Sequence, residues 1–582
     1  MLSIRVKPFL AYLSLFVLTL TLIGCTAVPG AVKERLSLPL DADIKTFNPV
    51  LVSDAYSAAA VGLVFSGLLT TDKNGNLIPE LAEKWQFRNN GLELIFTLKP
   101  NLRWSDGTPL TVDDVLFTFR DIYFNPAIPS SIQDIFRVGE KRELPVVKKL
   151  DDRSLSFTLP EPFAPFLRFA GGASILPKHI LEKTVQEKDS TGKPKFFQTW
   201  AIDTDLSTLV GNGPYLLKRY LPGERLVYER NPHYYRQPLP HIPRLVYQIM
   251  PSPDSTVLRF RSRDIDVIPQ VRGQDFPILK RQEQRYGFRI YQLGEGSNRS
   301  FLMFNLNRGR NQEGKPFVDP VKAEWFNDVN FRRAIAYAIN RQAMINTYYR
   351  GLGLPQDSPI PPISPYHLSR QEGVPFYDYD PAKAKELLQR SGFTYNAQNR
   401  LVDKKGNPVR FTIMTSTGGA GATLAPMIKN DLDRLGITVD LQIIDFTALI
   451  DRLDRSKNWE TAMLGWGGGI EPHGSFHLWY SAGSSHMFNL GPHPGEPPFP
   501  GRVVSDWEKE IDRLLIAGAR EINEEKRRQI YGQFQKLVQE QVPMIFMVSP
   551  LAMSAVNNRL QGIDPSPAGG VLWNLDELRL AE

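Results

Sequence analysis

Cys25 is the only cysteine among the 582 residues, so the chain cannot close an internal disulfide. Its folded structure must therefore rest on buried apolar side chains. The composition supplies them, since 42% of the residues are hydrophobic and 11% aromatic, as in ordinary globular proteins. Single hydrophobic cores stop growing beyond roughly 250–300 residues. A chain of this length is therefore expected to form two or three domains.

The first 25 residues have the pattern of a bacterial secretory signal. Arg5 and Lys7 precede an uncharged apolar run over 9–23, which is shorter than the roughly 20 residues of a membrane-spanning helix. The run ends in Leu-Ile-Gly-Cys, which matches the lipobox, where the cysteine is acylated and becomes the new N-terminus. We expect a signal peptide over 1–24 and a lipid anchor on Cys25. An uncleaved anchor helix is the alternative, and it also places the bulk of the chain outside the cytoplasm.

The charge of the chain argues against a nucleic-acid partner. The net charge of +7 includes Arg5 and Lys7, and residues 1–24 contain no acid, so the mature chain carries +5. The basic residues are scattered and mostly lie beside acids, whereas nucleic-acid-binding proteins gather them on one face. We expect a solvated surface and no nucleic acid among the partners.

Apolar periodicity predicts an α/β protein. Thr111 with Asp114 three residues later resembles a capping box that starts a helix;, and apolar residues follow Phe331 at helical spacing;. The predicted strands cover 92–98, 154–159, 301–306, 437–443 and 461–466;. The predicted helices of the later part cover 423–435 and 446–454. Strands and helices that alternate in this way are typical of layered α/β folds.

Several short segments follow one another in a specific order. They are Phe47-Asn48-Pro49, Gly67-Leu68-Leu69, 77–85, Trp104-Ser105-Asp106-Gly107-Thr108-Pro109, Gly211-Asn212-Gly213-Pro214-Tyr215, Phe331-Arg332-Arg333-Ala334-Ile335, Tyr379-Asp380-Pro381 and Gly465-Trp466. Each is weak by itself. Together they resemble the bacterial extracellular solute-binding protein family 5, the peptide- and nickel-binding proteins of ATP-driven (ABC) importers. The resemblance spans nearly all of residues 35–580.

The resemblance implies a periplasmic-binding-protein-like fold of class II type. Two lobes enclose a cleft and are joined by a hinge of two crossing strands, here expected near 300–305 and 546–551. The implied first lobe is discontinuous and covers 31–72, 203–299 and 548–582. A small domain is inserted at 73–202, and the second lobe covers 300–547. Such lobes close around a ligand by a hinge motion.

The resemblance also implies that the cleft captures a peptide or peptide-like ligand and hands it to the permease of an ABC importer. Strand addition to the peptide backbone would supply the binding. The implied ligand-binding residues are Ser53, Asp54, Tyr56, Asn305, Trp466, Gly467, Gly468, Gly469 and Glu471. Trp466 suits a flat apolar wall, although a plain buried tryptophan is the alternative. The glycine run would let a ligand approach the backbone closely.

One position departs from the family pattern. Peptide-binding members place an aspartate three residues after the tryptophan to hold the α-amino group of the ligand, and this chain has Gly469 there. A charge-assisted hydrogen bond of that kind contributes about 1.5–3 kcal/mol. We expect Glu471, or else Asp54, to replace it. If neither does, the ligand is not an ordinary peptide.

Other chemistries have weaker support in the sequence. His473, His477 and His486 invite a metal or metal-chelate interpretation of the nickel type, but no nearby cysteine or paired carboxylates complete a ligand set;. Ser190 and Lys193 match Ser-x-x-Lys only within a polar loop, and the other common hydrolase and phosphate-binding motifs do not occur. We therefore expect no enzyme and no cofactor. A sensory binding protein of the same fold is a further alternative.

Overall fold

The computed structural model describes residues 34–52, 54–128, 130–139, 141–417, 420–493 and 496–581. The predicted signal peptide, the predicted lipidation site Cys25 and Ser53 lie outside these ranges. Within the described ranges, no helix combines the length and the apolar character that crossing a membrane requires.

The first lobe is built on a four-stranded sheet with the strand order β1-β10-β9-β8. β1 runs parallel to β10, and the other neighbours are antiparallel. Leu36 and Leu38 of β1 are fully buried, because the sheet covers α2 and the start of the small domain. The elements are β1 (Arg35–Leu40), α2 (Ala55–Val61), β8 (Tyr215–Leu221), β9 (Arg225–Arg230) and β10 (Arg244–Ile249). A hairpin of β2 (Leu69–Thr71) and β3 (Leu77–Pro79) follows α2.

The small domain is an antiparallel sheet with the order β4-β5-β7-β6 and helices packed on one side. Phe157 of β7 packs edge-on against Phe119 at 4.7 Å and against Phe166 at 5.2 Å between ring centroids. Its buried side chains form one continuous cluster with those of the first lobe. The elements are β4 (Ala82–Arg88), β5 (Glu93–Leu98), α3 (Val112–Phe117), α4 (Ser131–Phe136), β6 (Val146–Lys149), β7 (Ser154–Thr158), α5 (Pro165–Gly172) and α6 (Lys178–Gln186).

The second lobe has its own core around a five-stranded sheet with the order β18-β17-β19-β13-β20. β17 is parallel to β18 and β19, and β13 is antiparallel to β19 and β20. Residues 301–304 of β13 are fully buried, as expected for a central strand that is covered on both faces. The strands are β13 (Arg299–Phe304), β17 (Arg410–Ser416), β18 (Thr438–Ile444), β19 (Thr461–Trp466) and β20 (Met544–Phe546).

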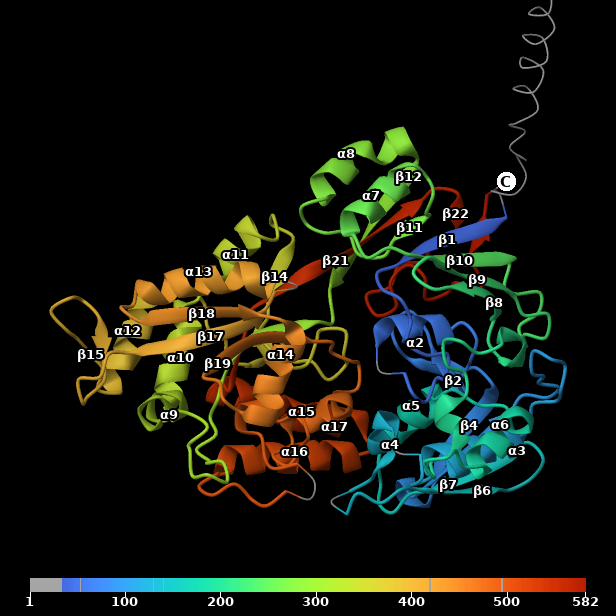
Figure 1. Ribbon diagram of the computed structural model, residues 1–582, viewed down its shortest axis with the longest axis horizontal. Coiled ribbons are helices and arrows are strands. Elements are labelled where there is room, and N and C mark those ends of the chain that lie inside the picture. The colour runs from blue at the N-terminus through green and yellow to red at the C-terminus, as the bar shows by residue number, and fades with distance from the viewer. Residues whose placement is uncertain are drawn as a thin grey trace, which may run out of the picture.

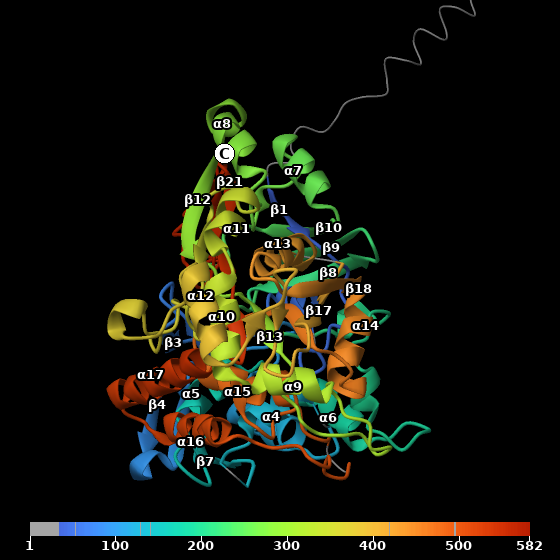
Figure 2. The same ribbon diagram turned by 90° about the vertical axis from the view of Figure 1, so that its left-hand side faces the viewer.

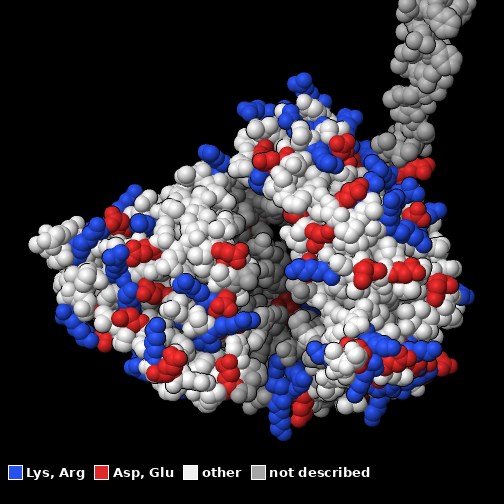
Figure 3. All heavy atoms as spheres, in the orientation of Figure 1, with Lys and Arg blue, Asp and Glu red and all other residues white. Residues whose placement is uncertain are grey.

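Helices cover this sheet, and α16 pairs with α17 at the end of the lobe that faces the small domain (Figure 1). They are α9 (Pro320–Asn327), α10 (Val329–Ala338), α11 (Arg341–Thr347), α12 (Pro381–Arg390), α13 (Gly421–Asp433), α14 (Phe446–Asp451), α15 (Phe476–Trp479), α16 (Asp506–Arg520) and α17 (Glu524–Gln541). A deep hollow separates the two lobes on the face shown in Figure 3.

The chain passes between the lobes at two places where one strand leads into the next. β12 (Phe288–Glu295) leads into β13, and β20 leads into β21 (Val548–Asn557), which pairs antiparallel with β12, β11 (Val267–Ile268) and β14 (Gly353–Pro355). α7 (Pro253–Arg261) and α8 (Phe276–Tyr286) pack beside β12 and β21 at one end of the molecule (Figure 1 and Figure 2). The predicted class, two lobes joined by crossing strands with an inserted small domain, is confirmed, and the predicted domain boundaries stay predictions.

The predicted start of helix α3 is confirmed, because it depends only on residues close together in the chain. The hydroxyl of Thr111 accepts a hydrogen bond from the N–H of Asp113, and the carboxylate of Asp114 accepts one from the N–H of Thr111, which completes the predicted capping box. The same helix then continues as a π-helical turn over Thr118–Tyr123, which the pattern did not indicate. The long amphipathic helix α16 was also not predicted.

Candidate functional site

Segment 466–471 lies where the two lobes and their connection meet. It begins at the last residue of β19, and the N–H of Gly468 donates to the carbonyl of Ser297, between β12 and β13, at 3.1 Å. The side chain of Ile470 lies against Gly75, in the turn between β2 and β3 of the opposite side. The predicted binding segment therefore contacts both the hinge region and the β2–β3 turn on the opposite side of the groove.

A cavity of about 470 Å³ lies beside this segment, between the two sides of the molecule. Its walls come from the turn 74–77 and Arg168 of α5 on one side, and from 362–366, Glu471 and Arg527 on the other. Sites for small ligands commonly enclose about 300–1,000 Å³ and lie between domains. Of the predicted ligand-binding residues only Glu471 lines this wall, together with its neighbour Ile470, because most of the other residues come from segments far apart in the chain.

Trp466 is a half-buried tryptophan at the end of β19 in the second lobe. Its ring packs against Phe301 at 4.3 Å and edge-on against Trp479 at 6.3 Å between centroids. Core packing therefore fixes the ring, and the indole is still partly exposed. Both interpretations made from the sequence, a core residue and an apolar wall, are compatible with this position. Its contact with a ligand stays a prediction.

The three glycines after Trp466 have different surroundings. A Cβ atom on Gly468 would lie 2.6 Å from the carbonyl oxygen of Ser297 and 3.0 Å from the ring of Pro361. The close approach that needs a glycine there is thus made to the chain itself. Gly467 and Gly469 are exposed, and their N–H groups make no hydrogen bond within the described ranges. These two positions offer free backbone donors at the predicted binding segment.

Glu471 is not a free carboxylate. It forms an ion pair with Arg527 at 2.8 Å, and the two side chains are 7% and 4% exposed. The carboxylate also accepts a hydrogen bond from the N–H of His473 at 3.2 Å. Burial disfavours the charge of Arg527, but attraction to Glu471 outweighs burial and raises the pKa of the guanidinium. The prediction that Glu471 binds a ligand amine therefore requires this pair to open. No local pattern points to Arg527 as its partner, because Arg527 lies 56 residues further along the chain.

Asp54 and Tyr56 belong to the start of α2 in the first lobe. The carboxylate of Asp54 accepts hydrogen bonds from the N–H groups of Tyr56 and Ser57 and from the hydroxyl of Ser57, at 2.7–3.1 Å. Burial opposes ionisation, but these hydrogen bonds outweigh it and lower the pKa of Asp54. The side chain is thus a helix N-cap;. Asp54 and Glu471, the two proposed replacements for the missing aspartate, both have partners within the protein.

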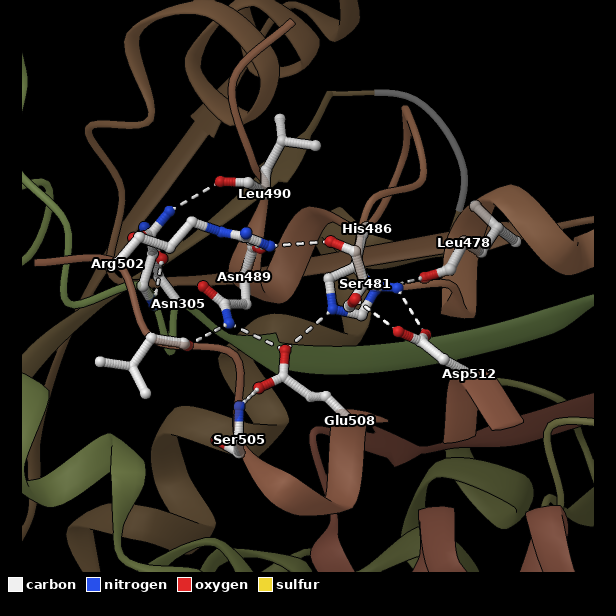
Figure 4. Close-up of polar contacts among 12 residues, drawn as sticks. Asn305, Leu478, Ser481, His486, Asn489, Leu490, Arg502, Ser505, Glu508 and Asp512 are labelled. Carbon is white, nitrogen blue, oxygen red and sulfur yellow. Dashed lines mark hydrogen bonds and ion pairs between the residues drawn. The ribbon is translucent and has the colours of Figure 1, made fainter. Parts of the chain in front are cut away.

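Asn305 lies inside the second lobe and was wrongly placed in the ligand-binding set. The residue is 1% exposed. Its amide donates to the carbonyls of Lys457 and Trp459 at 3.2 and 3.0 Å, and its oxygen accepts from the N–H of Asn307. It therefore holds the loop before β19, next to the buried polar network of Figure 4.

The histidines of the metal interpretation do not come together. His486 is fully buried in the network of Figure 4, where one ring nitrogen lies 3.0 Å from the carboxylate of Glu508 and the other 3.2 Å from the carbonyl of Leu478. The ring of His473 instead packs against Phe163 at 4.8 Å. In the described part of the chain, no group of three histidine, cysteine, aspartate or glutamate side chains is placed to hold a metal ion. His473, His477 and His486 are therefore not a metal site here.

A second set of contacts joins the lobes at the end opposite the hinge. We call it the latch. Glu161 of the small domain accepts two hydrogen bonds from Arg520 of α16, at 2.8 and 2.6 Å. The N–H of Ala164 donates to the carbonyl of Ala519 at 2.9 Å. Together with the packing of Phe163 on His473, these contacts link the small domain directly to the second lobe. No sequence motif marked them, because every pair is separated by more than 300 residues.

Two lobes around a groove, a connection of crossing strands and a cavity at the interface define an extracytoplasmic solute-binding protein of the hinge-closing type. The chain belongs to the bacterial extracellular solute-binding proteins, family 5. The model of this family, described as "Bacterial extracellular solute-binding proteins, family 5 Middle", matches residues 76–487. The resemblance expected from the short segments is thereby confirmed, and the family is one of solute-binding proteins rather than enzymes.

Individual relatives are similar over almost the whole chain. The dipeptide-binding protein of Escherichia coli (strain K12) is 25% identical over 574 residues, which cover 95% of this chain and 96% of the relative. The oligopeptide-binding protein AppA of Bacillus subtilis, solved in complex with a nonapeptide, is 21% identical with a TM-score of 0.71, covering 94% of this chain and 99% of its own. NikZ of Campylobacter jejuni, solved with Ni(L-His), is 23% identical with a TM-score of 0.72 and the same coverage.

Proposed function

We propose that this chain is a lipid-anchored, extracytoplasmic solute-binding protein that captures a peptide or peptide-like ligand between its lobes and delivers it to the permease of an ABC importer. Membership in family 5 supports the solute-binding role. The names of the Escherichia coli and Bacillus subtilis relatives support peptides as the ligand class. The relative with Ni(L-His) has the same fold, so a metal chelate is the second candidate.

The observation that carries the peptide proposal is the backbone beside Trp466. Gly467 and Gly469 expose N–H groups that have no partner within the described ranges. Peptides are commonly bound by strand addition, in which main-chain hydrogen bonds provide affinity and are indifferent to the ligand's sequence. A peptide strand placed here would pair with these groups while one of its side chains covers the indole.

The α-amino group of the ligand needs a negative partner that position 469 does not supply. Glu471 remains our candidate, because it lines the cavity and follows the glycine run. Its carboxylate reaches a ligand amine only when the ion pair with Arg527 rearranges. A ligand whose amine is blocked or absent would leave the pair intact, so the chemistry of the natural ligand decides between the two arrangements.

The first experiment is mass spectrometry of the small molecules released when natively purified protein is denatured. A set of short peptides supports the proposal. A stoichiometric metal or a single non-peptide compound refutes the peptide assignment and leaves the solute-binding role in place. Genetic deletion of the permease that this protein serves separates transport from sensing, since a sensory protein would keep its cellular effect without import.

The lipid anchor has its own test. Acylation of Cys25 predicts that the mature N-terminus is this cysteine and that its mass exceeds the value of the unmodified peptide by the attached acyl groups. Intact-mass measurement of the membrane fraction checks this. Cys25→Ser is expected to release the protein from the membrane fraction. Equal membrane retention of the variant and the wild type would refute lipidation as the means of attachment.

A further inference from the structure

α7 and α8 form a two-helix layer at the hinge end of the molecule. An ion pair at 2.5 Å joins Asp254, in the first turn of α7, to Arg272, in the segment that leads into α8, and Arg261 lies over the ring of Tyr286 at their last turns. Their inner faces are buried in a cluster with β12 and β21. The outer faces of both helices are therefore turned away from the protein.

These outer faces combine positive charge with exposed apolar side chains. Leu258 of α7 is 65% exposed and Ile278 of α8 is 47% exposed. Around them lie four exposed arginines, and within the described ranges none of the four has a carboxylate at ion-pair distance. We call this set the α7–α8 surface. It consists of Leu258, Arg259, Arg263, Ile278, Arg281 and Arg285.

The acids of the same region do not neutralise this surface. Residues 251–290 contain eight lysines and arginines and five acids. Four of the acids are held in ion pairs, with Arg272, Lys280 or Arg559. Asp264 alone keeps an unpaired charge among the described acids of this region. Figure 3 shows lysine and arginine side chains gathered at this end of the molecule.

The N-terminal segment enters the fold at the same end. β1 begins at Arg35, and Ser37 exchanges two hydrogen bonds of 2.8 Å with Asp266, in the loop that follows α7. Figure 1 and Figure 2 both show the start of β1 at the end that carries α7 and α8. The ten residues from Cys25 to Arg35 span at most about 35 Å. A membrane attachment at Cys25, which is part of the proposed function, would keep this end of the protein close to the bilayer.

We propose that the α7–α8 surface binds the anionic phospholipid headgroups of the membrane to which the chain is attached. Anionic leaflets attract each nearby lysine or arginine by about 1 kcal/mol, which is roughly fivefold in affinity. The two exposed apolar side chains reach the headgroup layer, as in interfacial amphipathic helices. The hollow between the lobes lies on another part of the surface (Figure 3). This contact therefore holds the protein with its groove open to solutes.

The test uses the full chain reconstituted into vesicles without any permease. A bimane fluorophore on Leu258→Cys reports contact with lipid through quenching by nitroxide lipids, and the chain without this substitution corrects for labelling at Cys25, its single cysteine. Vesicles contain phosphatidylglycerol and phosphatidylcholine, or phosphatidylcholine alone. The same label on Phe446→Cys of α14, which is 58% exposed on the other lobe, is the positional control.

We expect quenching at position 258 only in anionic vesicles and its loss in about 1 M salt, where the Debye length falls to about 3 Å. The triple variant Arg259→Gln, Arg281→Gln and Arg285→Gln should lower the quenched fraction toward the value in phosphatidylcholine, since three cations represent up to roughly 100-fold in affinity. A matched triple variant on the second lobe, Arg390→Gln, Arg434→Gln and Arg455→Gln, has the same charge change and should have no effect.

Three outcomes overturn the inference. They are an unquenched label in both kinds of vesicle, equal quenching in the two kinds of vesicle, and equal loss in the two triple variants. If the chain attaches to vesicles but the label at position 258 is unquenched, lipid binding by the α7–α8 surface is refuted and attachment through the lipid anchor still stands. A chain that binds neither kind of vesicle refutes both. Ligand release by denaturation is independent of all these outcomes, so the solute-binding role is tested separately.

Discussion

Replacing Glu471 with glutamine removes one charge from a buried ion pair. The structure predicts a large loss of stability, because Arg527 would keep its charge with only 4% of its side chain exposed. Removing one partner of such a pair typically costs about 3–5 kcal/mol. For a unit of 150–250 residues each kcal/mol corresponds to roughly 2–4 °C, so the melting temperature should fall by roughly 6–20 °C.

The assay is calorimetry or denaturant unfolding of Glu471→Gln, Arg527→Met and the double variant. The double variant should recover most of the loss, because neutral residues of similar size replace a buried pair with little cost. The coupling energy between Glu471 and Arg527 in this double-mutant cycle should exceed about 2 kcal/mol. Glu524→Gln is the matched control, since Glu524 lines the same cavity but is exposed. It should change the stability by less than about 0.5 kcal/mol.

If Glu471→Gln lowers the free energy of unfolding by less than about 1 kcal/mol, or if the two substitutions are additive in the double variant, the buried ion pair does not stabilise the protein as described. The same variants test the ligand role. If Glu471 binds a ligand amine, the double variant regains stability but not affinity. If the carboxylate is only structural, affinity returns together with stability, and an unchanged affinity in Glu471→Gln ends the amine hypothesis.

Three further predictions concern single positions. Burial, with repulsion from nearby cations, lowers the pKa of His473 from 6.5 to about 3. The form in which the latch contacts bury His473 therefore binds fewer protons than a form with the lobes apart. Its stability relative to that open form should fall by up to about 1.4 kcal/mol per pH unit as the pH drops below 6.5. Small-angle scattering should therefore show the lobes separating at acid pH in the wild type, and His473→Phe should not show this opening. Gly468→Ala should cost about 1–3 kcal/mol and lower ligand affinity, because its Cβ would press on the carbonyl of Ser297, whereas Gly467→Ala should be tolerated. Asn305→Ala should cost about 1–3 kcal/mol, because two carbonyls lose their donor;. Its ligand affinity in calorimetric titration should stay unchanged.

The sequence by itself determined the features that depend on near neighbours. The capping box at Thr111, the buried strand over 301–304 and the location of β18 follow from spacing within a few residues, so the pattern located them to within one or two positions. The order of the short segments also predicted the family and the two-lobed fold. Local hydrogen bonds and apolar periodicity are encoded in adjacent residues, which is why they can be read before folding.

Only the tertiary structure decided what each polar residue near the binding segment does. Glu471 was predicted to hold a ligand amine, and it pairs with Arg527 of α17, 56 residues further along the chain. Gly468 was expected to let a ligand approach the backbone, and its close approach is to Ser297, between β12 and β13. Asn305 has the polarity of a binding residue, but it is enclosed by the loop before β19. The physical reason is common to all three. Charge compensation and close packing depend on which distant segments fold against one another, and no spacing in the sequence records that.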